Sequence, residues 1–154
     1  MKKLFKKIDL RIIKTARQIS LPLARFSIFI IFFWFGVLKI FGSSSANLLV
    51  ESLLQKTLPI VSFEYFFIAL GLYEIFVGLI ILIPLLDRLA IGMLLVHMAT
   101  TFLPLVFLPS LTWQGFLTPT LEGQYIIKNL VITALAICLA AYVRPLQRNK
   151  NKKL

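Results

Sequence analysis

The sequence is poor in the side chains that most thiol and metal chemistry requires. Among its 154 residues it has one cysteine, Cys138, and one histidine, His97. A single cysteine excludes an internal disulfide, and the lack of any C-x-x-C pair excludes autonomous dithiol exchange and covalent haem attachment. Because metal sites usually need several donors, a lone histidine more often makes a hydrogen bond in a core. We therefore expect no metal and no haem.

Charged residues are also scarce, at 15%, whereas hydrophobic residues make up 59% of the chain. A soluble domain is about half apolar and about a quarter charged. A helix needs about 20 mainly apolar residues to cross a bilayer. Runs of that length occur at 23–41, 63–86, 89–108 and 124–143. The sequence predicts an all-α fold, an integral membrane four-helix bundle over residues 23–143.

The few acidic residues leave a net charge of +11, and the basic residues cluster at the two ends. Eight Lys and Arg lie within residues 2–25 and five within 144–154, whereas the third loop, 109–123, has none. By the positive-inside rule, both termini are expected to face the cytoplasm from a cell (inner) membrane. Nucleic-acid binders gather charge on one folded face, so we expect membrane lipid and no nucleic acid as partner.

Residues 1–22 form a basic segment with helical periodicity, which predicts an amphipathic helix lying on the inner membrane surface. Pro22 is expected to turn the chain into the first span. The alternative is a solvated basic tail, and residues 144–154 are predicted to be such a tail. Leu10 and Ile13 break the pattern. The apolar face holds Leu4, Phe5, Ile8, Ile12, Ala16 and Ile19, and the other holds Lys3, Lys6, Lys7, Lys14 and Arg17.

The first and third loops carry their own signals. Residues 46–57 have apolar residues at helical spacing, which predicts a short surface helix capped near Ser45 or Asn47. The third loop is rich in turn-forming residues, and its Trp113 and Phe116 are expected at the level of the lipid headgroups.

Five ionisable residues interrupt the apolar runs: Lys39, Glu64, Glu74, His97 and Lys128. A charge near the bilayer centre costs about 2.5–3.5 kcal/mol, so each needs a partner or a function. Two carboxylates and two ammonium groups balance in sign, which predicts one shared polar cluster with Lys39–Glu74 and Glu64–Lys128 as ion pairs. Alternatively, Lys39 extends to the headgroups and Glu64 lies at the outer boundary.

Glycines accompany two of these charges. Gly36 and Gly42 flank Lys39, and Gly71 and Gly78 flank Glu74, each set on one helix face. Glycine permits membrane helices to approach closely, so the first two spans are predicted to meet at their charged residues.

The third and fourth spans present further polar residues at helical spacing, which predicts a small polar pocket between the helices. The hydroxyls of Thr100 and Thr101 are expected to bond back to their own helix. Aromatic walls are expected from Phe32, Phe33, Trp34 and Tyr73, and polar groups from Met93, His97, Thr101, Tyr125, Lys128, Asn129 and Thr133.

These residues resemble motifs of the DoxX-like family of small membrane proteins. The first span, FWFGVLKIFG, is similar to the family's aromatic-Gly-x-x-Lys-x-x-Gly element, and GLYEIFVGL to its Gly-x-x-Glu-x-x-x-Gly element. LEGQYIIKNL, with Glu122, Lys128 and Asn129, resembles the start of its last span. The resemblance covers residues 24–140, except that Ile-Pro-Leu ends the second span where glycine is usual. It implies a four-helix membrane protein, in some members linked to quinone-coupled oxidation of sulfur compounds and in others to thiol stress.

Three functional hypotheses follow. The first is a membrane subunit that binds a quinone or similar lipophilic redox molecule, with Glu74 and His97 as catalytic groups and a soluble or membrane partner as electron source. Lys39, Glu64, Lys128, Asn129 and Tyr73 would contribute to ligand binding. The second is a small transporter or channel working as a homo-oligomer, and the third is a non-catalytic assembly or stress protein.

Overall fold

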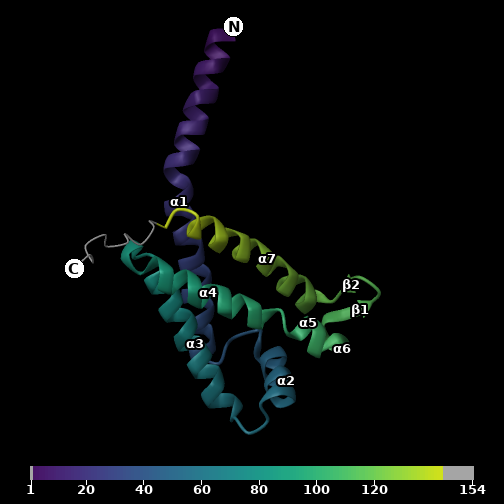
Figure 1. Cartoon of the computed structure of the whole chain (residues 1–154). Coiled ribbons are helices and arrows are strands. Elements are labelled where there is room, and N and C mark those ends of the chain that lie inside the picture. Colours follow the sequence, from purple (N-terminus) through teal and green to yellow (C-terminus); the bar gives the residue numbers. More distant parts are fainter. Residues whose placement is uncertain (1, 144–154) are drawn as a thin grey trace, which may run out of the picture.

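The computed structural model describes residues 2–143, so the basic tail predicted for 144–154 lies outside the described residues. Four helices are long and apolar enough to cross a membrane, as predicted: Leu4–Ile40, Phe63–Ile80, Pro84–Phe107 and Leu121–Ala140. The chain is thus an all-α, multi-pass membrane protein (Figure 1). Its long helices are α1 (Lys2–Ile40), α3 (Phe63–Ile80), α4 (Asp87–Thr101) and α7 (Leu121–Ala140).

The first two spans, α1 and α3, pack along each other at a glycine contact. A Cβ built on Gly36 would lie 2.6 Å from the carbonyl oxygen of Gly71, and one on Gly71 would lie 2.8 Å from that of Gly36. One on Gly78 would lie 3.0 Å from the backbone nitrogen of Phe33. The prediction that glycines bring these two helices together is confirmed at these three positions.

The second pair of spans, α4 and α7, also pack side by side, and contacts of α3 with α4 and of α1 with α7 join the two pairs. Their meeting point is an apolar core of interdigitating aliphatic side chains. Its fully buried members include Ile28 on α1, Val77 on α3, Leu94 on α4 and Ala136 on α7.

Short elements lie at one end of the bundle (Figure 1). They are α2 (Asn47–Thr57), α5 (Pro104–Phe107), α6 (Pro109–Thr112) and a hairpin of β1 (Trp113–Gly115) and β2 (Thr118–Pro119). A separate 3-10 turn, η1 (Pro84–Leu86), directly precedes α4. The side chain of Thr120 accepts a bond from the backbone of Gly123 at 3.1 Å, which caps the start of α7. Trp113 donates its indole N–H to the carbonyl of Leu105 at 3.0 Å.

Three local predictions are wrong. Pro22 does not turn the chain, because α1 continues through it as one helix of 39 residues. Gly42 does not face α3: it adopts φ 67° just past the end of α1, a left-handed conformation that glycine takes without strain. The short helix α2 follows Ala46 and has no side-chain cap, so neither Ser45 nor Asn47 caps it.

The glycine contact yields a stability prediction. Gly36→Ala forces a methyl group against the backbone of α3, and such overpacking typically costs about 1–3 kcal/mol. We expect Gly36→Ala to melt at a lower temperature than wild type in mild detergent. Gly92→Ala is the matched control, because a Cβ on Gly92 meets nothing within 4 Å. Equal melting temperatures for the two variants would show that α1 and α3 do not pack this closely in solution.

Candidate functional site

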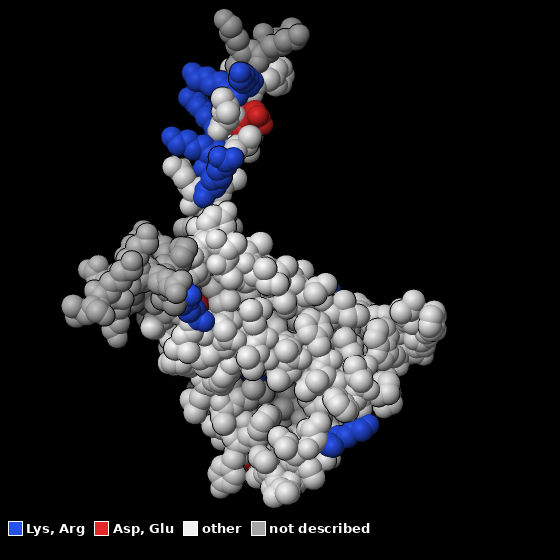
Figure 2. All heavy atoms as spheres, viewed as in Figure 1, with Lys and Arg blue, Asp and Glu red and all other residues white. Residues whose placement is uncertain are grey.

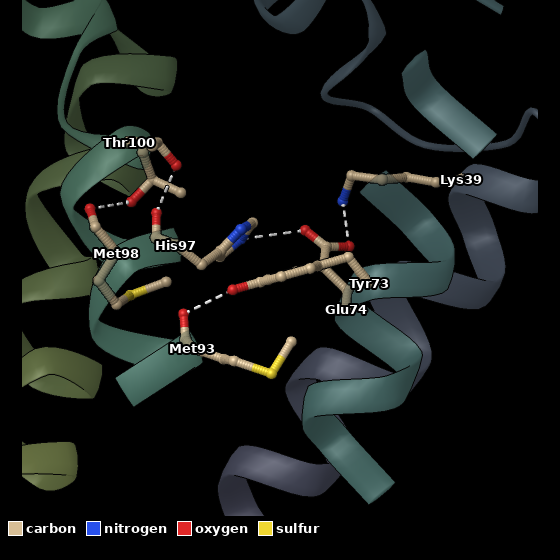
Figure 3. Close-up of polar contacts among 8 residues, drawn as sticks. Lys39, Tyr73, Glu74, Met93, His97, Met98 and Thr100 are labelled. Atoms are coloured by element: carbon tan, nitrogen blue, oxygen red, sulfur yellow. Dashed lines mark hydrogen bonds and ion pairs between the residues drawn. The ribbon is translucent and has the colours of Figure 1, made fainter. Parts of the chain in front are cut away.

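A buried carboxylate on α3 joins side chains from two other helices (Figure 3). Lys39, in the last turn of α1, donates to Oε2 of Glu74 at 2.7 Å. The second oxygen, Oε1, lies 3.2 Å from Nε2 of His97 on α4. The predicted Lys39–Glu74 pair is confirmed, and His97 adds a third member. We call Lys39, Glu74 and His97 the buried triad.

Aromatic rings from α1 and α3 fix the position of the imidazole. The ring of Phe32 is edge-on to that of His97, with 5.3 Å between centroids, and the ring of Tyr73 lies at 5.8 Å. The hydroxyl of Tyr73 donates to the carbonyl of Met93 at 2.8 Å, so it ties α3 to α4 one turn before His97. Phe32 and Tyr73 are aromatic neighbours as predicted, whereas Trp34 is exposed on the outside of the bundle.

The two threonines that follow His97 on α4 direct their hydroxyl groups to carbonyls of their own helix. The hydroxyl of Thr100 donates to the carbonyl of His97, and that of Thr101 to the carbonyl of Met98, each at 2.8 Å. Both threonines therefore satisfy their own helix, as predicted, and the polar face of α4 is reduced to His97.

The triad is nearly enclosed but retains some access. The side chains of Lys39, Glu74 and His97 are 7–8% exposed. With few waters to screen it, the carboxylate depends on its two neighbours for compensation. Figure 2 shows that the surface over α3 and α2 is hollowed, whereas most of the visible bundle is a continuous uncharged face.

The structure does not bring the other predicted residues into this cluster, so the single cluster of all five ionisable groups is wrong. Glu64 is exposed in the first turn of α3, where a carboxylate is favoured by the helix dipole. Lys128 is exposed on α7 with its ammonium 5.1 Å from the ring centre of Tyr125. Within residues 2–143 they form no ion pair with each other, and the side chain of half-buried Asn129 makes no hydrogen bond to the triad.

A second charge pair lies at the opposite end of the bundle, and the sequence analysis missed it. Arg25 on α1 contacts both carboxylate oxygens of Asp87, the first residue of α4, with Nη2 to Oδ2 at 2.7 Å. It also donates to the carbonyl of Ile81, at the end of α3, at 2.9 Å. The apolar runs carried a signal for this pair, because they place Arg25 at the start of the first run and Asp87 between the second and third, at the same end of the bundle.

The comparisons with known proteins add no relative. The chain matches no protein-family model, no curated protein and no solved structure. The site therefore has to be interpreted from its own geometry. That geometry places one carboxylate between an ammonium and an imidazole, each from a different helix.

The triad yields a prediction about stability. Lys39→Met leaves Glu74 without its cation, and breaking a buried pair typically costs about 3–5 kcal/mol. The double variant Lys39→Met/Glu74→Gln removes both charges and is expected to recover most of that loss. Thermal unfolding in mild detergent measures both effects.

Lys128→Met is the control, because the Lys128 side chain is exposed. It is expected to melt close to wild type. If Lys39→Met also melted like wild type, or if the double variant were no more stable than the single one, the ammonium of Lys39 would not compensate Glu74.

Proposed function

We propose that the chain is a membrane subunit that binds a quinone, or a similar lipophilic redox molecule, beside the buried triad. The observation that carries the proposal is the carboxylate of Glu74 held between Lys39 and His97 inside a bundle of membrane-spanning helices. Ionisable groups within such helices mark ligand or proton pathways by default. A molecule dissolved in the lipid can approach a site that lies between membrane-spanning helices.

The donors at the site suit a ligand with carbonyl oxygens. An ammonium group carries three N–H donors, and the recorded bond to Glu74 uses one from Lys39. The imidazole of His97 has a second ring nitrogen besides the Nε2 that faces Glu74. The rings of Phe32 and Tyr73 supply flat apolar surface for a ring-shaped headgroup.

The work left to this chain is the handling of protons. A bound quinone would accept two electrons and two protons overall on conversion to the quinol. Glu74 and His97, which contact each other, can pass a proton between them, and the ammonium of Lys39 lies against the second carboxylate oxygen. The electrons would come from a soluble or membrane partner that carries its own redox centre.

The resemblance to the DoxX-like family supports the same proposal from the sequence. The motif positions on which the resemblance rests include Gly36, Lys39, Gly71 and Glu74. In the structure these residues form the contact between α1 and α3 at the triad. We propose on this basis that the chain belongs with these small membrane proteins. A bacterial inner membrane with both termini in the cytoplasm is the location that fits its basic ends.

Mass spectrometry of an organic extract tests the proposal. Wild-type protein, purified in mild detergent from membranes that contain quinone, should retain it in near-stoichiometric amounts. Glu74→Gln and Lys39→Met should lose it, since each removes a charge next to the donors. Glu64→Gln is the matched control, because Glu64 is an exposed carboxylate on the same helix.

Two results would overturn the assignment. If only bulk phospholipid is extracted from folded wild-type protein, no quinone is bound. If Glu64→Gln and Glu74→Gln retain the same amount of quinone, it binds elsewhere. Proteoliposome flux that requires Glu74, without bound quinone, would replace the proposal with the transporter or channel hypothesis.

A further inference from the structure

The first half of α1 extends beyond the bundle. Figure 1 shows this part of the helix projecting away from the other elements. With a rise of 1.5 Å per residue, a helix of 39 residues is about 58 Å long, against a hydrocarbon thickness of about 30 Å. The part from Pro22 to Ile40 already accounts for about 27 Å. The residues before Pro22 therefore lie outside the hydrocarbon.

This projecting half has one apolar face with no partner in the described chain. The spacing of its large apolar side chains keeps them on one side of the helix, and they are 45–68% exposed. Standing upright in water, the helix would leave this whole face hydrated, which is unfavourable. The face consists of Leu4, Phe5, Ile8, Ile12 and Ile19.

The opposite face is basic. Figure 2 shows Lys and Arg side chains gathered along the projecting helix, with one acidic side chain among them. The helix thus combines an apolar face with cationic flanks, which is the arrangement of helices that lie in the surface of an anionic membrane. The basic residues with described side chains are Lys6, Lys7, Arg11, Lys14 and Arg17.

Pro22 supplies the point at which the helix can change direction. Proline has no N–H to donate to the carbonyl four residues earlier, and its ring favours a bend there. Just beyond it, Arg25 is tied to Asp87 and to the carbonyl of Ile81, so the span itself is held while the segment before Pro22 is not.

We propose that residues 4–20 bind the surface of the bilayer that holds the bundle, with the apolar face in the lipid and the basic residues on anionic headgroups. In the structure α1 is continuous through Pro22. Binding in this way requires the helix to bend on the membrane surface, and the missing N–H makes bending easier at this residue. This membrane-surface segment is independent of the buried triad, so it stands whether or not the chain binds a quinone.

Labelling of single cysteines tests the proposal in the full chain. Cys138→Ala provides the background, because the native cysteine is exposed. Ile12→Cys reports on the apolar face and Leu10→Cys on the opposite one, and the two native side chains are similarly exposed, at 63% and 56%. Each variant is placed in nanodiscs of phosphatidylcholine, with or without phosphatidylglycerol, and treated with a membrane-impermeant maleimide.

We expect Ile12→Cys to react at least about tenfold more slowly than Leu10→Cys in discs that contain phosphatidylglycerol. High salt, or the triple variant Lys6→Gln/Lys7→Gln/Lys14→Gln, should remove much of that difference, because both weaken attraction to anionic headgroups.

Equal rates at the two positions in both kinds of disc would overturn the proposal. Protection of Ile12→Cys that is independent of phosphatidylglycerol, but increases with the number of chains per disc, would also overturn it. That result would assign the apolar face to contact with a second copy of this chain.

Discussion

The carboxylate of Glu74 is the group on which the arrangement of the helices depends. A charge among apolar helices is tolerated only with compensation, and here the compensation comes from two other helices, through Lys39 on α1 and His97 on α4. The glycine contact makes this possible, because only without side chains at Gly36 and Gly71 do α1 and α3 come close enough for the lysine to be buried against Glu74. Packing and charge thus require the same three helices to meet at one point.

The pair of Arg25 and Asp87 has a related role at the other end of the bundle. Its guanidinium contacts the start of α4 and the end of α3, so α1, α3 and α4 are joined by polar contacts at two levels. Between these levels lies the apolar core around Ile28, Val77 and Leu94. In lipid, apolar contacts alone give little preference for one rotation of a helix over another. Two polar anchors separated along the helices are therefore a physical means of selecting one arrangement.

The same reasoning links stability to the proposed activity. A site that takes up and releases protons cannot be fully optimised for stability, since its charges have to change during use. In the buried triad the ammonium of Lys39 balances the carboxylate, while His97 contacts the other carboxylate oxygen. The polar contacts of Thr100 and Thr101 with their own helix leave it as the polar contribution of α4 to this point.

The sequence by itself determined the number and places of the membrane-spanning helices, because bilayer thickness sets the length of an apolar run. It also predicted the contact of Lys39 with Glu74, since charge balance and glycine spacing marked the faces of α1 and α3. The contact of His97 with Glu74 agrees with the expected Lys, Glu and His cluster. The exposure of Glu64 and Lys128 and the pairing of Arg25 with Asp87 were decided only by the tertiary structure. The spans are apolar on nearly all sides, so sequence periodicity does not reveal which face of α4 or α7 points inward. The sequence also did not show that α1 continues through Pro22. A proline removes one backbone hydrogen bond, which weakens a helix without being sufficient to end it.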